Sequence, residues 1–302
     1  MPSYEFVTVD VFTDRPFGGN PLAVFPEAQG LGADEMQALA REFNYAETTF
    51  VLPPDDPANS ARVRIFTPAR ELPFAGHPNV GTAFVLAGRW QGAGNAFRFE
   101  QDAGLVSVRV FRHPDGQPSA AELDAPRSLQ IGEGVPTDTL ARCVGLDPAD
   151  IRTGSHHPLS ASTGLAFVIA EVTGRAALAA AGPDWAAFRD AAEAFPDLAQ
   201  HFSVHLYARD EADPVRLYAR MFSPLLGVPE DPATGSANAA LAALLVSLAP
   251  GEDVELAFDI LQGVEMGRPS QLAARASKTA EGAVTASIGG GCVPMMRGVI
   301  DL

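Results

Sequence analysis

The chain has 302 residues, 47% of them hydrophobic, which is enough apolar material for one large domain or two of ordinary size. Its 21 basic and 37 acidic side chains give a formal net charge of −16, which repels nucleic acid and an anionic membrane surface. We therefore expect neither nucleic acid nor a membrane as a partner.

Hydrophobic alternation and β-branched residues predict strands through much of the chain. Residues 4–12 form the first, and a turn marked by Pro16 and two glycines leads to a second strand at 22–25. Apolar residues at helical spacing predict a helix over 34–43. Further strands are predicted at 48–52, 63–66, 96–100, 105–111, 164–170, 201–208, 215–222 and 254–261, with a last one near 298–302. So many strands with few βαβ units favour an α+β protein built on antiparallel sheet.

Two predicted helices, 79–90 and 235–248, are apolar on nearly every side. Such helices must be enclosed by the rest of the fold. We expect each to lie inside a curved sheet. Glycines 289–291 lack the strand-to-helix context of a phosphate loop, so they are expected to mark a turn or bulge.

The same two helices end the copies of an internal repeat. Residues 64–83 and 220–239 align without gaps at an offset of 156, and both copies read as a strand, a Pro-bounded loop and a buried helix. The identical pairs are Arg64/Arg220, Phe66/Phe222, Pro68/Pro224, Pro73/Pro229 and Ala83/Ala239. We expect two pseudo-symmetric lobes, 1–122 and 123–285, each an antiparallel sheet or barrel around its central apolar helix, with a last strand in 286–302 returning to the first lobe.

The cysteines and the chain start bear on where the protein works. Cys143 and Cys292 lie far apart, outside any CxxC motif and away from a plausible histidine partner, so we expect no disulfide framework and no structural metal. The first residues lack the basic start and continuous apolar run of a signal peptide, so a cytoplasmic protein is expected. The longest apolar stretch, 237–249, is shorter than the ~20 residues that span a bilayer.

Each repeat places a glycine-containing loop before its helix. The N–H groups of a helix start, with the helix dipole, favour an anion, and Gly76 permits close approach of the backbone. In the second copy, the segment 231–236 has the same place, and whether Asp231, Thr234 or Ser236 caps the helix is left open. A small carboxylate held by these amides is the expected ligand.

Three side chains are candidates for proton chemistry. Glu47 lies in the apolar context YAETTFVL, which would desolvate the carboxylate and raise its pKa, as a general acid/base requires. The alternatives are a solvated glutamate at a strand start, a helix-capping imidazole for His77 and an N-cap for Asp231. The position of all three on or beside the repeated loops favours a functional role.

Motifs along nearly the whole chain identify a resemblance. They are VDVFTDRPFGGNPLAVF, NYAETTFVL, RIFTPARELPFAGHPNVGTA, RMFSPLLGVPEDPATGSA and LQGVEMGRPS, of which ELPFAGHP and EDPATGSA are the most specific. The sequence resembles the PhzF-like family of phenazine-biosynthesis isomerase homologues, which is related in fold to diaminopimelate epimerase and proline racemase.

The resemblance implies a homodimer of two-lobed subunits with the active site between the lobes and no cofactor or metal. It implies that Glu47 is the acid/base and that His77, Asp231 and Ser236 orient the substrate. Amides around Gly76 and Gly235 would receive the substrate carboxylate, and Asn20, in the first matching segment, is assigned to substrate binding. The chain departs from the phenazine enzyme at Ala46, where that enzyme has serine before the catalytic glutamate.

The expected function is therefore a cofactor-independent isomerase that moves a proton on a small cyclic carboxylate. The alternatives are an amino-acid or hydroxy-acid epimerase or racemase, with Asp231 or His77 as the base that opposes Glu47, and a non-catalytic protein that binds small carboxylates. The related two-thiol racemases carry a cysteine at the head of each helix. This chain has none at either place, which disfavours stereoinversion through thiols.

Overall fold

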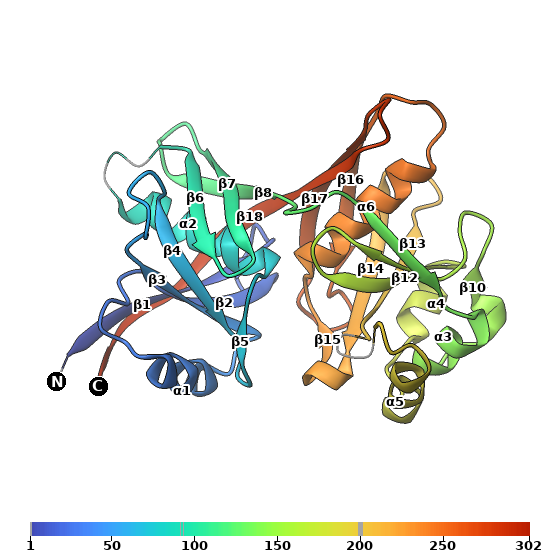
Figure 1. Ribbon diagram of the computed structural model, residues 1–302, viewed down its shortest axis with the longest axis horizontal. Helices are drawn as coiled ribbons and strands as arrows, with labels where there is room; N and C mark the ends of the chain where they lie inside the picture. The colour runs from blue at the N-terminus through green and yellow to red at the C-terminus, as the bar shows by residue number, and fades with distance from the viewer. Residues whose placement is uncertain (1, 91, 93, 199–201) are drawn as a thin grey trace. The chain divides into compact units, whose positions relative to one another are not determined.

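A computed structural model describes residues 2–90, 92, 94–198 and 202–302. The chain packs as two units, one of Met1–Pro126 with Gly289–Leu302 and the other of Arg127–Ile288. Figure 1 labels most of their helices and strands. The long strand β18 (Val284–Asp301) begins in the second unit and ends in the first.

The first unit is a closed barrel. Its strands pair in the order β1, β2, β3, β4, β6, β7, β8 and β18, and β18 pairs back with β1. Besides β18 these are β1 (Ser3–Val11), β2 (Asn20–Phe25), β3 (Glu47–Leu52), β4 (Ala61–Phe66), β6 (Ala96–Gln101), β7 (Gly104–Arg112) and β8 (Pro118–Asp124). The pairs β2–β3 and β4–β6 are parallel, so the sheet is mixed rather than purely antiparallel.

Helix α2 (Gly76–Arg89) fills the barrel. Every residue from Gly76 to Ala87 is buried, and the helix packs against β1, β2, β3, β7 and β8. At Gly81 an added Cβ would lie 2.6 Å from Leu22 Cδ2, so only glycine lets the helix approach that strand so closely. The short strand β5 (Glu71–Leu72) precedes the helix, and α1 (Ala33–Phe43) covers an aromatic cluster outside the barrel.

The second unit repeats this plan with additions. Helix α6 (Gly235–Leu248) is almost wholly buried and packs against strands of this unit. The strands are β9 (Gln130–Gly134), β10 (Ile151–Arg152), β11 (Leu159–Ser162), β12 (Ala166–Val172), β13 (Val204–Arg209), β14 (Arg216–Ser223), β15 (Val228–Asp231), β16 (Val254–Gln262) and β17 (Ser270–Lys278). Three short helices, α3 (Thr137–Cys143), α4 (Arg175–Ala180) and α5 (Trp185–Ala194), contribute to a further core cluster.

The predicted fold class is confirmed, with corrections in detail. Helix α2 begins at Gly76 rather than residue 79, because Pro78 fits the first turn of a helix and does not interrupt it. Residues 289–291 lie inside β18 and form no turn. A Cβ at Gly289 would come within 2.7 Å of Ala121 O, so close strand packing explains this glycine. Residue 201 of the strand predicted at 201–208 lies outside the described residues.

The register of the repeat also needs correction. The strands keep the offset of 156. Phe66 pairs with Thr48, and the residues 156 positions later, Phe222 and Val204, also pair. The helices begin at Gly76 and Gly235, an offset of 159, so the gapless pairing of Pro73 with Pro229 and of Ala83 with Ala239 is wrong. A single-turn helix (Pro224–Leu226) between β14 and β15 accommodates the longer connection.

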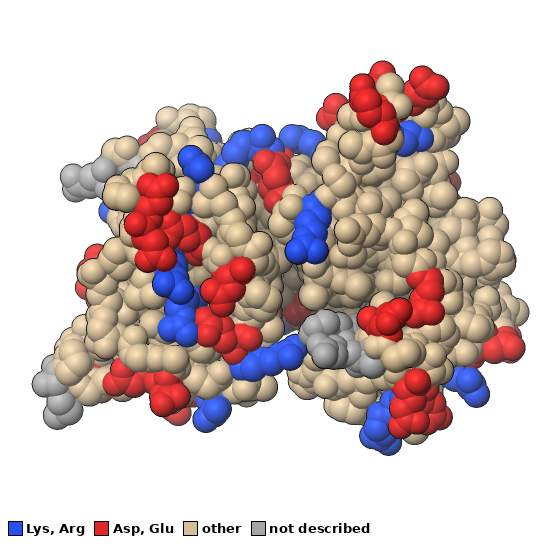
Figure 2. Space-filling view, viewed as in Figure 1, with Lys and Arg blue, Asp and Glu red and all other residues tan. Residues whose placement is uncertain are grey.

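Charge is dispersed over the surface. On the face seen in Figure 2, acidic and basic side chains form small separate groups without a continuous basic area. Within the described part of the chain, no helix combines the length and apolar character needed to cross a membrane.

Candidate active site

Three predicted site residues meet in the first unit. His77 Nδ1 lies 3.3 Å from the amide nitrogen of Asn20, and His77 Nε2 lies 3.3 Å from Glu47 Oε2. Asn20 is fully buried, whereas the side chains of His77 and Glu47 are 6% and 16% exposed. The imidazole therefore lies between an amide and a carboxylate, and the carboxylate retains access to solvent.

Local structure brings these three side chains together from distant parts of the sequence. Asn20 begins β2 after a turn in which Gly19 has φ +63°, and a Cβ at Gly19 would lie 2.2 Å from Val11 O. Glu47 begins β3, which runs parallel to β2 with Leu22 opposite Glu47. His77 is the second residue of α2.

Burial determines the charge on His77. Desolvation lowers the pKa of this imidazole from 6.5 to about 3, so the ring is neutral at pH 7. Because the Asn20 amide nitrogen can only donate, Nδ1 is the acceptor and the ring proton resides on Nε2. The carboxylate of Glu47 thus faces a neutral N–H group, and the contact is not an ion pair at neutral pH.

The starts of the two buried helices share one feature. In the described chain, no side chain caps α2 at its N-cap Ala75 or α6 at its N-cap Thr234. By contrast, Asp184 caps α5 by accepting from the amides of Ala186 and Ala187. The first N–H groups of α2 and α6 therefore remain uncapped by side chains, which is the state that favours an anionic ligand.

The question of which residue caps α6 is answered by the loop geometry. Thr234 occupies the N-cap position, but its hydroxyl donates to Asp231 Oδ2 at 2.5 Å and does not accept from the helix. Asp231 is buried at the end of β15, Gly235 is the first helical residue, and Ser236 is half-buried beside it. These three predicted site residues lie together in the second unit.

A polar pair supports the helix start in both units. Asn79 Nδ2 donates to Ala75 O at 2.8 Å, and Asn79 exchanges hydrogen bonds with Gln101 at the end of β6. The equivalent asparagine, Asn238, donates to Thr234 O at 3.0 Å and to Gln262 Oε1 at 2.7 Å. Each pair ties the first turn of the buried helix to the strand that follows it.

Gln262 also holds the loop that carries Asp231. Its amide nitrogen donates to Asp231 O at 2.8 Å and to Thr234 Oγ1 at 3.1 Å, and its oxygen accepts from Thr234 N at 3.2 Å. His205 Nε2 donates to Asn238 Oδ1 at 3.0 Å, and both Gln262 and His205 are fully buried. The position of Asp231 therefore depends on a buried hydrogen-bond network.

The asparagine and glutamine pairs and His205 were not predicted from the sequence. One signal could have revealed the asparagines, since both helices begin Gly-x-x-Asn, at Gly76 and Gly235. The gapless offset of 156 hides this motif, which repeats at 159. The glutamines follow no periodic pattern, and their partners became visible only from the structure.

The two helix starts differ in chemistry. In the first unit Thr48 pairs with Phe66, and in the second Val204 pairs with Phe222, so Thr48 and Val204 correspond. The residues just before them, Glu47 and Ser203, therefore correspond too. By helix position, Ser236 corresponds to His77. The first unit carries the acid and imidazole at these positions, and the second carries hydroxyls. Among described residues, no group of three or more His, Cys, Asp or Glu side chains could hold a metal ion.

Comparison with known proteins finds relatives along the full length. A family model described as phenazine biosynthesis-like protein matches residues 9–298. An uncharacterized isomerase of Mesorhizobium japonicum is 39% identical over 99% of both chains. The trans-2,3-dihydro-3-hydroxyanthranilate isomerase of Pseudomonas chlororaphis is 36% identical over 99% of this chain and 100% of its own. The crystal structure of a PhzF-family phenazine biosynthesis protein from Bacillus anthracis matches over 100% of both chains at 25% identity with a TM-score of 0.85.

Proposed function

This chain belongs to the phenazine biosynthesis-like family, and from that membership we propose that it isomerises a small cyclic carboxylate by proton transfer through Glu47. The observation that carries the proposal is the half-buried Glu47 carboxylate facing the N–H of a neutral imidazole. A carboxylate in this setting can accept a proton from carbon and return it, and its access to solvent lets that proton exchange in between.

The proposed reaction has two balanced proton steps. The Glu47 carboxylate removes a proton from one substrate carbon and becomes a carboxylic acid, while the electron pair enters the conjugated system of the substrate. The acid then gives the proton to a second carbon, and the carboxylate is restored. The N–H of His77, 3.3 Å from Glu47 Oε2, stabilises that carboxylate when it is charged, and Asn20 fixes the ring tautomer that places the proton there.

Substrate binding is proposed to use the uncapped helix starts. The amides around Gly76 and Gly235 are suited to a carboxylate, and Asp231 and Ser236 supply an acceptor and a hydroxyl for other polar groups of the substrate. No cofactor is required for these steps. A homodimer and a cytoplasmic location remain predictions.

A two-base epimerase is the less favoured reading. Stereoinversion needs a second base on the opposite face of the substrate carbon, and the repeat places Ser203 where the first unit has Glu47 and Ser236 where it has His77. A hydroxyl is a poor base at neutral pH, so the repeat itself supplies no matching partner for Glu47. The proposal is therefore a single-carboxylate isomerisation.

The test is turnover of trans-2,3-dihydro-3-hydroxyanthranilate, the compound named for the relative that is 36% identical, and of other enolisable cyclic carboxylates. We expect isomerisation by the wild type without added cofactor, and a kcat reduced about 10²- to 10⁴-fold in Glu47→Gln. The exposed glutamate variant Glu42→Gln is the matched control and should retain full activity. If Glu47→Gln turns over as fast as the wild type, the proposed mechanism is wrong. If carboxylates raise the melting temperature without any turnover, the protein is a binder.

A further inference from the structure

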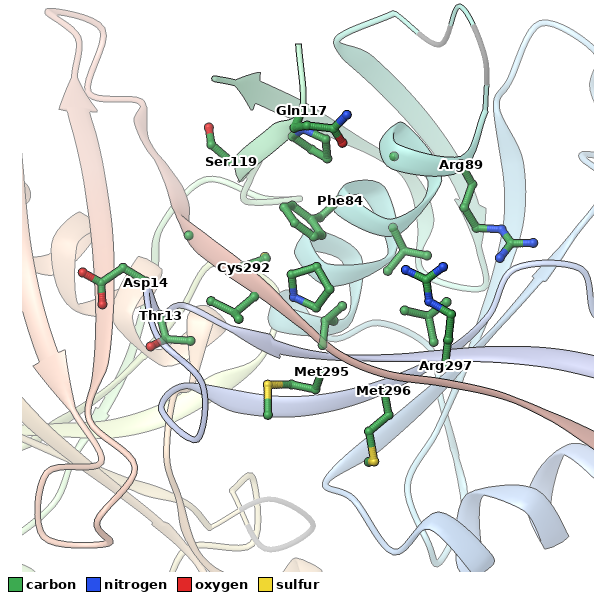
Figure 3. A pocket seen from close by; sticks show the side chains of 18 of the residues that line it. Thr13, Asp14, Phe84, Arg89, Gln117, Ser119, Cys292, Met295, Met296 and Arg297 are labelled. Atoms are coloured by element: carbon green, nitrogen blue, oxygen red, sulfur yellow. The ribbon is translucent and has the colours of Figure 1, made fainter. Parts of the chain in front are cut away.

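The barrel of the first unit has a cavity in its wall that is separate from the candidate active site. Its volume is about 720 Å³, within the usual range for sites that bind small molecules. Residues of β1, β8 and β18 and the last turns of α2 line it, and Asn20, Glu47 and His77 do not. Figure 3 shows this space, which we call the seam cavity.

Two of the strands that line the cavity carry a proline. Strand β8 begins at Pro118, and β18 carries Pro294. Proline has no N–H, so neither residue donates a ladder hydrogen bond, although Pro294 is in register with Val9 and Pro118 with Arg112. Opposite Pro294, a bulge interrupts the pairing of β18 with β1 between Thr8 and Val9. The cavity therefore lies beside α2 at an irregular part of the barrel wall.

Gly88 keeps the cavity open. It lies in α2 with no positive φ, where glycine destabilises a helix relative to alanine. A Cβ at Gly88 would meet only Pro118 Cγ, at the ordinary contact distance of 3.6 Å. Neither the backbone conformation nor crowding therefore requires glycine at position 88. A larger side chain there would occupy part of the seam cavity.

The lining combines an apolar floor with positive charge at one end. Phe84, Val85 and Cys292 are buried in the floor, and burial raises the pKa of the Cys292 thiol to about 12, so this thiol is apolar lining and no nucleophile. Arg89 and Arg297 lie at one end, away from Asp14 (Figure 3).

The two arginines differ in their partners. Arg89 Nη2 lies 2.6 Å from Glu5 Oε2. Arg297 is exposed and makes no ion pair within the described chain. A guanidinium without a carboxylate partner, beside an apolar floor in a protein of net charge −16, suits a ligand with an acidic head and an apolar body.

We propose that the seam cavity is a second binding site, for a small aryl or acyl carboxylate whose head lies at Arg297 and Arg89 and whose body covers Phe84 and Val85. The site is independent of the proposed reaction, since it shares no lining residue with Asn20, Glu47 and His77.

Calorimetric titration with 1-naphthoate and its neutral counterpart 1-naphthylmethanol tests the proposal. The wild type should bind the carboxylate roughly three- to tenfold more tightly than the alcohol, and Arg297→Gln should remove that preference. Gly88→Leu should abolish binding of both probes without lowering the melting temperature, because leucine favours the helix and fills the space. Gly88→Ala is the matched control, which should improve the helix equally and still bind.

Three results would overturn the proposal. Undiminished naphthoate binding by Gly88→Leu would place the ligand elsewhere in the molecule. Absence of binding by the wild type at millimolar probe would mean that the cavity takes no such ligand. Light scattering that shows a dimer in the wild type and a monomer in Gly88→Leu would show that a second copy of the chain covers the cavity instead.

Discussion

Burial sets the protonation of two histidines, His77 within α2 and His205 beside α6. Desolvation lowers the pKa of His77 from 6.5 to about 3 and that of His205 from 6.5 to about 4. In the unfolded chain both rings bind a proton as the pH falls below about 6.5, whereas in the folded chain they remain neutral until the pH nears the lowered values. The free energy of unfolding therefore decreases on acidification through this window, by up to about 1.4 kcal/mol per pH unit for each ring.

Denaturant unfolding between pH 6.5 and 4.5 measures this dependence for His205. We expect the variant His205→Gln to lose about 1 kcal/mol less stability per pH unit than the wild type, because it lacks one ring that must stay neutral. His157→Gln, which changes an exposed ring, is the control and should follow the wild type. Equal slopes for His205→Gln and the wild type would mean that His205 is protonated alike in the folded and unfolded chains.

Single polar residues at strand ends hold the loop before α6. Gln262, at the end of β16, bonds to the backbone oxygen of Asp231 and to both the amide and hydroxyl of Thr234. Substitution by glutamate keeps the shape but removes both donated hydrogen bonds and places a carboxylate oxygen against two oxygens. The loop that carries Asp231 should consequently shift or loosen.

Gln262→Glu should therefore lower the free energy of unfolding by about 1–3 kcal/mol, the usual cost of buried polar groups left unsatisfied. It should also raise KM more than it lowers kcat, because Asp231 is proposed to bind the substrate and Glu47 to carry the proton. Gln271→Glu, on an exposed site of the neighbouring strand β17, should change neither quantity. Unchanged stability and KM in Gln262→Glu would show that the loop does not depend on this side chain.

The sequence predicted many of the elements in which burial imposes a period, although it missed β17, where buried and exposed residues alternate. Strands such as β1 and β16 and the enclosed helix α6 lie where alternation or continuous apolar character indicates them. The short helices α3, α4 and α5 have too few turns to establish a period, and no prediction covered them. The three-residue shift of the repeat depends on a loop insertion between β14 and β15, which a gapless alignment cannot represent.

The site residues that lie in local motifs could be predicted, and those held by contacts distant in sequence could not. Motif resemblance led to Asn20, Glu47 and His77, which the structure brings into contact. Gln262 and His205 act through buried hydrogen bonds between segments distant in sequence, so no local pattern distinguishes them. A raised pKa for Glu47 stays a prediction.

The molecule as a whole is a duplicated scaffold with unequal chemistry. Both units keep an asparagine–glutamine pair at the helix start and a bidentate arginine–glutamate pair beside it, Arg64 with Glu71 and Arg220 with Glu230. Support for the helix start is thus common to both units. Glu47 and His77 belong to the first unit alone, where the second has Ser203 and Ser236. This inequality is the basis for assigning the proton transfer to one carboxylate.

The most direct test of Glu47 as the proton carrier is the NMR spectrum of the product formed in deuterium oxide, which shows where deuterium enters. If Glu47 carries the proton between two carbons, that proton can exchange with solvent while Glu47 is a carboxylic acid. The wild type should then place deuterium at the carbon that gains the proton, and Glu47→Gln should place none under the same conditions. Equal deuterium at that carbon with both proteins would contradict the assignment of Glu47.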